Sequence, residues 1–249
     1  MKILLVNDDG IQSIGIQALA HELSLKHDIV VAAPAMEQSG MAHAITVHKR
    51  IEVETYPPLL EAGCMEAWRI HGTPADCVKI YLEAMSAQQK PDLVVSGINK
   101  GANLGTDVLY SGTVGGAIEG HLHGIPSIAV SLDIDSEISY ENVARLFMQR
   151  LPMLLNEAKP VLLNINFPTK VKDNIPSFVY TKVGHRDYAN AFKRIEENGR
   201  CFYMMGGEIY DGENSDITDI YAVQHGYIAI TPLQLDLTDH TLLDIKLND

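Results

Sequence analysis

The chain has 249 residues, of which 46% are hydrophobic and 20% charged, and its formal net charge is −13; these values describe a globular protein with an ample core. The negative charge argues against binding along the backbone of a nucleic-acid polymer, which needs clustered Lys and Arg, and no apolar run is long enough for a signal peptide or a membrane span. The three cysteines lie far apart without a CxxC pair, so we expect reduced thiols, no zinc site and a cytoplasmic location.

The first two thirds of the chain alternate strand-like and helix-like segments. Apolar runs predict buried strands at residues 3–6, 29–33, 66–70, 92–95, 125–132 and 161–166. Apolar residues at helical spacing predict helices at residues 16–23, 113–123 and 143–155, and a further helix begins at Pro74 with Thr73 as its N-cap. Strands that alternate with helices indicate βαβ units around a parallel sheet, so we expect an α/β fold. Alternating apolar and polar residues over 44–56 predict a solvent-facing β-ribbon.

After about residue 170 the pattern changes. Short β-like runs at residues 178–183 and 227–231 lie among Gly, Asp and Asn turns. Residues 206–220 are rich in glycine and acidic residues, which indicates a mobile loop or arm. We therefore divide the chain into a core at residues 1–170 and a β-rich C-terminal extension at residues 171–249. We expect this extension to pack on, or exchange with, a neighbouring subunit.

The most informative segment is Asn7-Asp8-Asp9-Gly10, where the first predicted strand ends. Ligands of open α/β sheets collect beyond the carboxyl ends of the strands. Two adjacent carboxylates at such a place repel each other and lose hydration, so they need a proton or a cation. Oxygen ligands favour Mg²⁺, Mn²⁺ or Ca²⁺ over Zn²⁺. In the simpler alternative, Asp9-Gly10 forms a turn and Asp8 caps the following helix.

Two further loops follow predicted strands and carry similar chemistry. One contains Ser39, Gly40 and His43, and the other runs from Ser96 through Asn99 and Asn103 towards Tyr110. In a doubly wound sheet these loops meet the Asp8-Asp9 segment at one edge. Together they offer carboxylate, hydroxyl and amide oxygens, the ligand set of a hard cation. Ser39 lacks the G-x-S-x-G context of a nucleophile elbow, so it is a metal or phosphate ligand rather than an acylated serine.

The segment Ser111-Gly112-Thr113 predicts a helix start that can bind an anion. Free N–H groups at a helix N-terminus, together with hydroxyls, suit a phosphate group. In the alternative, Ser111 or Thr113 only caps the helix, and the glycines only permit close packing on the sheet. His43 and Lys100 carry a similar alternative, because a single loop histidine or lysine is more often a surface or packing residue than a catalytic one.

Taken together, these loops resemble the SurE family of survival-protein nucleotidases, which are also acid phosphatases. The resemblance extends over nearly the whole chain in the order of the family. The segments that carry it are residues 7–10, Ser39 with residues 43–46, residues 72–78, residues 96–99 with Gly101, Asn103 and Gly105, and residues 110–114, 164–168, 184–188 and 226–233.

The resemblance implies a Rossmann-like, mostly parallel sheet flanked by helices. It also implies one divalent ion per subunit, Mg²⁺ or Mn²⁺, held by Asp8, Asp9, Ser39 and Asn99. Asp8, Asp9 and Asn99 are the expected catalytic residues. Phosphate is expected near the helix start, and the full set of phosphate-binding residues is Asn7, Gly40, Asn103, Ser111, Gly112 and Thr113.

The activity implied is that of a 5′-nucleotidase, a metal-dependent phosphomonoesterase acting on nucleoside 5′-monophosphates, with 3′-monophosphates and polyphosphate as further candidate substrates. A homodimer or homotetramer with an exchanged C-terminal arm is also implied. The alternative from another functional class is a nucleotide-binding regulator that holds the same phosphate without hydrolysing it. A dinucleotide-binding dehydrogenase is disfavoured, because no G-x-G-x-x-G follows the first strand.

Overall fold

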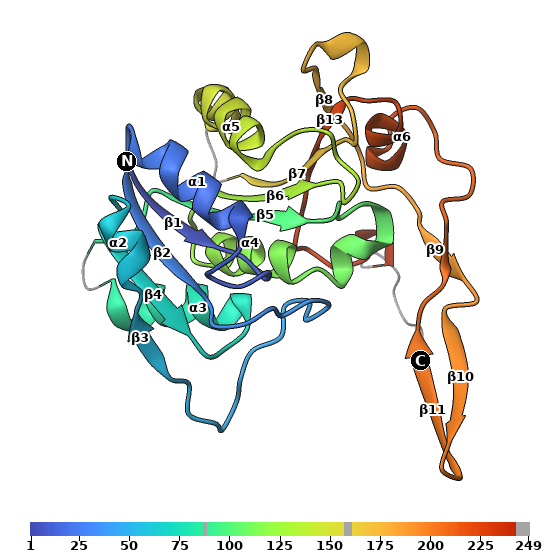
Figure 1. Ribbon diagram of the computed structural model, residues 1–249. Helices are drawn as coiled ribbons and strands as arrows, with labels where there is room; N and C mark the ends of the chain where they lie inside the picture. The colour runs from blue at the N-terminus through green and yellow to red at the C-terminus, as the bar shows by residue number, and fades with distance from the viewer. Residues whose placement is uncertain (87–88, 157–160, 243–249) are drawn as a thin grey trace, which may run out of the picture.

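A computed structural model describes residues 1–86, 89–156 and 161–242 of the chain. Its main sheet has nine strands in the order β3-β4-β2-β1-β5-β6-β7-β13-β8 (Figure 1). Their bounds are β1 (Lys2–Val6), β2 (Asp28–Pro34), β3 (Val53–Thr55), β4 (Glu66–Ile70), β5 (Leu93–Lys100), β6 (Ser127–Leu132), β7 (Leu162–Phe167), β8 (Phe178–Tyr180) and β13 (Ile228–Pro232).

The central strands are parallel, as the βαβ pattern predicts. From β4 through β2, β1, β5 and β6 to β7, every neighbouring pair runs in the same direction. The antiparallel pairs are β3 with β4 and β13 with β7. Successive strands after β1 are added on one side of it as β2 and β4, and on the other side as β5, β6 and β7. The carboxyl ends of β1 and β5 therefore form the topological switch point, where doubly wound folds bind their ligands.

Helices cover both faces of the sheet (Figure 1). Alternate residues of β1 supply the two cores, because successive side chains of a strand point to opposite faces. Ile3 and Leu5 join the cluster that includes buried residues of α1 (Ile14–Ser24) and α5 (Tyr140–Leu154), whereas Leu4 and Val6 join the cluster that includes α3 (Pro74–Ile80).

The helix α4 (Gly112–Leu122) lies beside α3 on the second face and packs closely on the sheet. An added Cβ at Gly116 would lie 2.9 Å from Ser96 Oγ, and one at Gly120 would lie 2.6 Å from Ser127 Oγ. Small residues in this helix are therefore required by its approach to β5 and β6. This confirms the expectation that glycines in this helix permit its close packing on the sheet.

The expected ribbon over residues 44–56 is wrong in extent. Only β3 (Val53–Thr55) is a strand there. The preceding residues are held by the N-terminus of α3 instead: Thr73 Oγ1 donates to Ala44 O at 2.6 Å, and Thr46 N donates to Asp76 Oδ1 at 2.8 Å. Thr73 also caps α3 as expected, accepting from Asp76 N at 3.1 Å. Residues 44 and 46 are thus bonded to the start of α3 rather than to a neighbouring strand.

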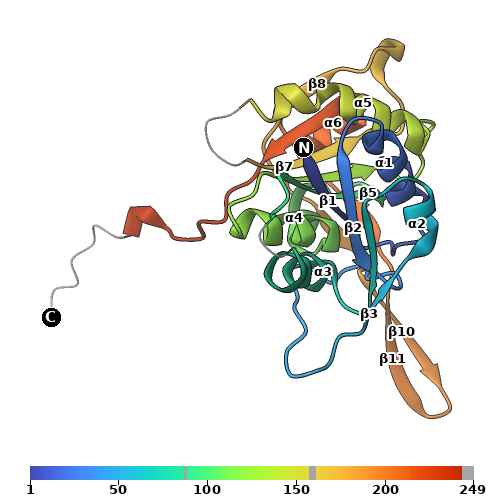
Figure 2. The same ribbon diagram turned by 90° about the vertical axis from the view of Figure 1, so that its left-hand side faces the viewer.

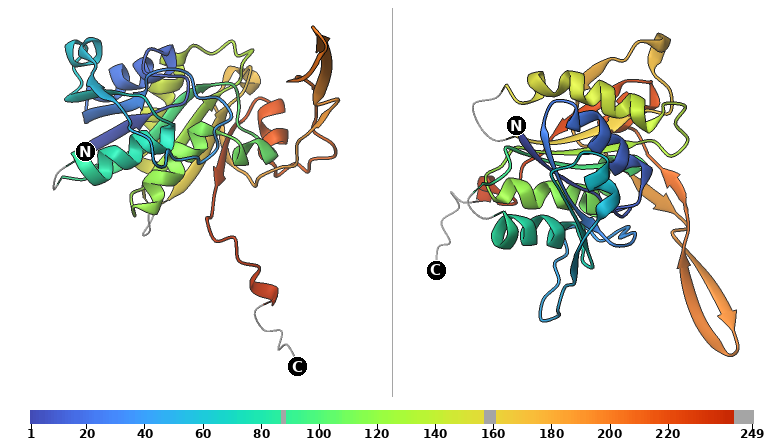
Figure 3. Two further views of the ribbon diagram at one scale, coloured as in Figure 1. Left: turned by 90° about the horizontal axis from the view of Figure 1, so that it is seen from below. Right: turned by 60° about the vertical axis from the view of Figure 1, so that its left-hand side comes forward.

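The C-terminal part contains more regular structure than its composition indicates. Residues 206–220 include β12 (Glu208–Tyr210) and the first residues of α6 (Asp219–Gln224), so they are not a loop throughout. β12 pairs with β9 (Asp187–Ala189), and β10 (Phe192–Glu197) with β11 (Arg200–Met205). The β10–β11 hairpin projects from the body of the molecule (Figures 1 and 3).

Other C-terminal residues belong to the body. β13 and β8 complete the main sheet, and the chain after β13 runs away from it (Figure 2). In that final segment Leu237 is 94% exposed. The division at residue 170 stays a prediction. Within the described parts of the chain, no helix combines the length and apolar character that crossing a membrane requires.

Candidate metal and phosphate site

The predicted carboxylates lie at the switch point of the sheet. Asp8 and Asp9 follow β1, and Asn99 lies near the end of β5, which pairs with β1 from Ile3 opposite Leu93 to Val6 opposite Ser96. Beyond the paired residues, Lys100 N donates to Asp9 Oδ2 at 2.9 Å. The two loops predicted to converge from separate parts of the sequence are therefore joined at the edge of the sheet.

Asp8 is the buried member of the acidic pair, with 6% of its surface exposed. Burial and the neighbouring Asp9 carboxylate raise the pKa of Asp8 to about 6, although the Thr113 hydroxyl, which donates to Asp8 Oδ1 at 2.5 Å, opposes the shift. Burial and the Glu37 carboxylate likewise raise the pKa of Asp9, against the opposing Lys100 N–H. The raised pKa values show that the charged form of each carboxylate is disfavoured at this place. A bound cation would stabilise that charged form.

The Ser39 loop lies against this pair. Gln38 N donates to Asp8 O at 2.7 Å, and Ala42 N donates to Tyr110 O at 2.9 Å. Between these two contacts are Ser39 and Gly40, both exposed. Gly40 has φ +71°, a left-handed conformation that favours glycine. Ser39 and Gly40 thus form the tip of a loop fixed on both sides.

The N-terminus of α4 closes the other side of the site. Ser111 caps the helix by accepting from Val114 N at 3.1 Å. An added Cβ at Gly112 would lie 2.9 Å from Asp8 Oδ2, so the first turn of the helix directly abuts the carboxylate. The capping function of Ser111 and the expected anion site are compatible, because the cap occupies one N–H of the turn and the helix dipole remains.

The donor atoms fit a hard divalent cation. The hydrogen bonds above hold Asp8 through Oδ1 and Asp9 through Oδ2, and Asn99 is held through Nδ2, which donates to Gly101 O at 2.7 Å. Asp8 and Asp9 thus each keep a second carboxylate oxygen for a ligand, and Asn99 keeps its single amide oxygen. Ser39 Oγ donates to Glu37 Oε1 at 2.7 Å and keeps lone pairs of its own. An all-oxygen set with two carboxylates suits Mg²⁺ or Mn²⁺.

Two predicted phosphate residues have other hydrogen-bond partners in the structure. Asn7 Nδ2 donates to Gly10 O and to Ser13 Oγ, which shapes the turn after β1. Asn103 is 9% exposed and donates from Nδ2 to Ser131 Oγ at 2.9 Å. Its backbone also bonds to the side chain of Asn166, which pins the loop after β5 to β7. Contact of Asn7 or Asn103 with phosphate stays a prediction.

A second charged cluster escaped the sequence reasoning. Glu119 on α4 contacts His43, Lys79 and His123, and Glu83 contacts Lys79 and His123. Ligand atoms of Glu83, Glu119 and His123 lie within 4.8 Å of one another. The Lys79 ammonium, however, already pairs with both carboxylates. The pairs Lys79–Glu83 and Glu119–His123 have i,i+4 spacing that the sequence carries, but the contacts that join them to each other and to His43 link distant positions and have no local motif.

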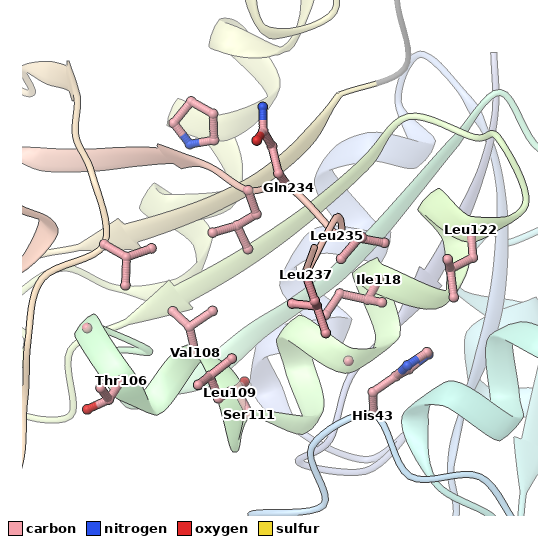
Figure 4. A pocket seen from close by; sticks show the side chains of 15 residues that line it. His43, Thr106, Val108, Leu109, Ser111, Ile118, Leu122, Gln234, Leu235 and Leu237 are labelled. Atoms are coloured by element: carbon pink, nitrogen blue, oxygen red, sulfur yellow. The ribbon is translucent and has the colours of Figure 1, made fainter. Parts of the chain in front are cut away.

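A cavity of about 690 Å³ begins at the cap of α4 (Figure 4). Ser111 and His43 line it together with apolar side chains, and Leu235 and Leu237 reach it from the C-terminal segment. Its volume is that of a site for a small organic molecule. An apolar space therefore adjoins the expected phosphate position.

Comparisons with known proteins agree with this architecture. The family model described as survival protein SurE matches residues 3–190. A protein from Pelotomaculum thermopropionicum named 5′-nucleotidase SurE is 44% identical over 98% of this chain and 93% of its own length. Another with that name, from Synechococcus, is 42% identical over 98% of this chain and 95% of its own. The crystal structure of the SurE protein from Aquifex aeolicus has a TM-score of 0.83 at 37% identity, covering 98% of this chain and 97% of that one.

Proposed function

The chain belongs to the SurE family, and from this membership we propose that it is a 5′-nucleotidase, a metal-dependent hydrolase of nucleoside 5′-monophosphates. Relatives that carry the name 5′-nucleotidase match it at 41–44% identity over nearly the full length. The observation that carries the proposal is the contact of Asp8, next to Asp9, with the N-terminus of α4. It supports a site in which the two carboxylates hold a cation and the helix end binds the phosphate.

Hydrolysis of a phosphate monoester depends chiefly on neutralising charge and on positioning the attacking water. Asp8, Asp9, Ser39 and Asn99 would hold a divalent ion, which would supply Lewis-acid chemistry to the phosphoryl group and the attacking water. The first turn of α4 stabilises negative charge on the phosphoryl oxygens through its N–H groups. Thr113 fixes the Asp8 carboxylate through its hydroxyl. One of the two aspartates accepts the proton of the attacking water.

The cavity beside Ser111 supports a nucleoside as the leaving group. The cavity is lined by Ser111, the residue that caps α4, so it adjoins the position proposed for the phosphate. Burial of a base and ribose there would supply binding energy away from the reacting phosphorus. We extend the proposal to 3′-monophosphates and polyphosphate as candidate substrates, and to Mg²⁺ or Mn²⁺ as the ion.

We also propose a homodimer or homotetramer with an exchanged C-terminal arm. The projecting β10–β11 hairpin carries exposed apolar residues, among them Phe192, Phe202 and Met205. The segment after β13 exposes Leu237 as well. Large exposed apolar side chains on projecting segments are typical of surfaces that a second copy covers.

The test is phosphate release from adenosine or guanosine 5′-monophosphate by the full chain. Chelator should abolish the release, and Mn²⁺ or Mg²⁺ should restore it. Asp9→Asn should lower kcat at least about 10²-fold, because it removes an anionic metal ligand, whereas Asp135→Asn at an exposed position should leave it unchanged. Near-normal metal-dependent turnover by Asp9→Asn refutes the ligand assignment. Tight nucleotide binding without release favours the regulator.

A further inference from the structure

Glu119 is a buried carboxylate whose two oxygens serve different partners. Its side chain is 5% exposed. Oε1 contacts Lys79 Nζ and His123 Nε2, both at 3.2 Å, and these two residues lie on α3 and at the end of α4. Oε2 contacts His43 Nε2 at 2.8 Å. One oxygen therefore joins the two helices, and the other joins α4 to the Ser39 loop.

The contact with His43 is one of several that hold this loop on α4. The backbone of Ala42 approaches the helix so closely that an added Cβ at Gly115 would lie 2.2 Å from Ala42 O. The next residue, His43, reaches one helical turn further along to Glu119, which lies four residues after Gly115. The other side-chain bond at this end of the loop is that of Thr73 to Ala44 O, described above.

The tip of the loop has little packing of its own. Ser39 is exposed, and an added Cβ at Gly40 would meet nothing within 4 Å. The position of the tip is therefore set by its anchors: the backbone bond of Gln38 to Asp8 on one side, and Ala42 with His43 on the other. A hydrogen bond to a buried charged group is stronger than one between neutral backbone groups. The His43–Glu119 contact is accordingly the charge-assisted anchor on its side.

We propose that His43 and Glu119 are positioning residues of the metal and phosphate site. Their contact fixes the loop that carries Ser39 and Gly40 against the helix whose N-terminus receives the phosphate. It thereby sets the spacing between the loop and helix sides of the site. This inference rests on the proposed function, because it assumes that Ser39 ligates the ion. The contact between α3 and α4 uses only Oε1 of Glu119. The proposal gives a function to the contact of Oε2 with His43 as well.

The design separates this task from a purely structural one. His43→Leu and His123→Leu each remove an imidazole from the same buried carboxylate, but only His43 belongs to the loop. His43→Gln keeps an N–H donor that can reach Oε2. The readouts are Mn²⁺ affinity by electron paramagnetic resonance, amide hydrogen exchange of residues 38–43, and the Tm of the full chain.

We expect His43→Leu to weaken Mn²⁺ binding about tenfold, which corresponds to about 1.4 kcal/mol, and to speed exchange in residues 38–43. We expect His43→Gln to recover most of the affinity, and His123→Leu to bind Mn²⁺ as the parent does. Unchanged affinity in His43→Leu overturns the inference, as does an equal loss in His123→Leu. If the parent binds Mn²⁺ without releasing phosphate, the proposed activity fails while the affinities still decide the positioning. If the parent binds no Mn²⁺, both fail.

Discussion

Substitution of Gly112 by alanine tests the contact between α4 and the carboxylate. Gly112 is the first residue of the helix, and its φ lies outside the left-handed region. Alanine is therefore compatible with its backbone, and replacing glycine in a helix is normally favourable by up to about 1 kcal/mol. The added Cβ, however, would lie 2.9 Å from Asp8 Oδ2, 3.0 Å from Asp8 Cβ and 3.2 Å from Gln38 O. We consequently expect Gly112→Ala to lower the activity without lowering the stability of the fold.

The size of the functional loss follows from these distances. An ordinary contact begins at 3.4 Å, so Asp8 has to move by about half an ångström to clear the new methyl group. A misplacement of about 1 Å in an active site can cost 10²-fold in rate, and half of that displacement corresponds to about tenfold. The loss should therefore be seen in kcat and in Mn²⁺ affinity, with no fall in Tm.

The assay compares Gly112→Ala with Gly206→Ala, an alanine introduced where a Cβ meets nothing within 4 Å. Phosphate release from adenosine 5′-monophosphate gives kcat, calorimetry gives Mn²⁺ affinity, and thermal unfolding gives Tm. Unchanged kcat in Gly112→Ala would show that the helix does not press on Asp8. A Tm loss of several degrees would instead show that the methyl group displaces the backbone.

Two further predictions follow from charge and burial. Because the pKa of Asp8 is raised to about 6, a metal ion has to displace the proton of Asp8 at lower pH. We therefore expect the Mn²⁺ affinity, measured by calorimetry, to be constant above pH 7 and to fall about tenfold per pH unit below pH 6. Equal affinity at pH 5 and pH 7 would contradict this expectation. Arg186, 9% exposed, pairs with Asp107 at 3.3 Å and Asp211 at 2.6 Å. Arg186→Met removes the cationic partner of both carboxylates, which costs about 3 kcal/mol and should lower Tm by about 6–12 °C. The Tm of Arg186→Lys should lie between those of the parent and Arg186→Met. A Tm of Arg186→Met within 2 °C of the parent would contradict this prediction.

Much of the fold could be predicted because its signals are local. The buried strands β1 and β5 contain apolar runs ended by polar residues, the apolar run of β2 ends at Pro34, and the Thr73 cap follows from its neighbours. The placement of β13 between β7 and β8 could not be predicted, since strand pairing over some fifty residues leaves no local pattern. The residues before β3 were mispredicted for a related reason: bonds from Thr73 and Asp76 outweigh an alternating pattern.

The candidate site shows the same division. The sequence predicts Asp8 and Asp9 as site residues because two acids after a buried strand are unusual, and Ser111 because it precedes a helix. The meeting of His43 with Glu119 is a tertiary contact across 76 positions, and no residue beside either one indicates it. Asn103 stays open between two roles, because a polar residue in a glycine-rich loop suits a phosphate ligand as well as the buried bond with Ser131 that the structure shows.

The insertion of β13 between β7 and β8 has a consequence for how the protein is made. β8 pairs only with β13 within the described sheet, and β13 (Ile228–Pro232) follows β7 (Leu162–Phe167) only after a long intervening segment. A nascent chain that has left the ribosome as far as α5 and β7 therefore presents an open sheet edge. The edge of β7 is covered only after residues 228–232 have been made, so chains that terminate before residue 228 leave this edge open to self-association.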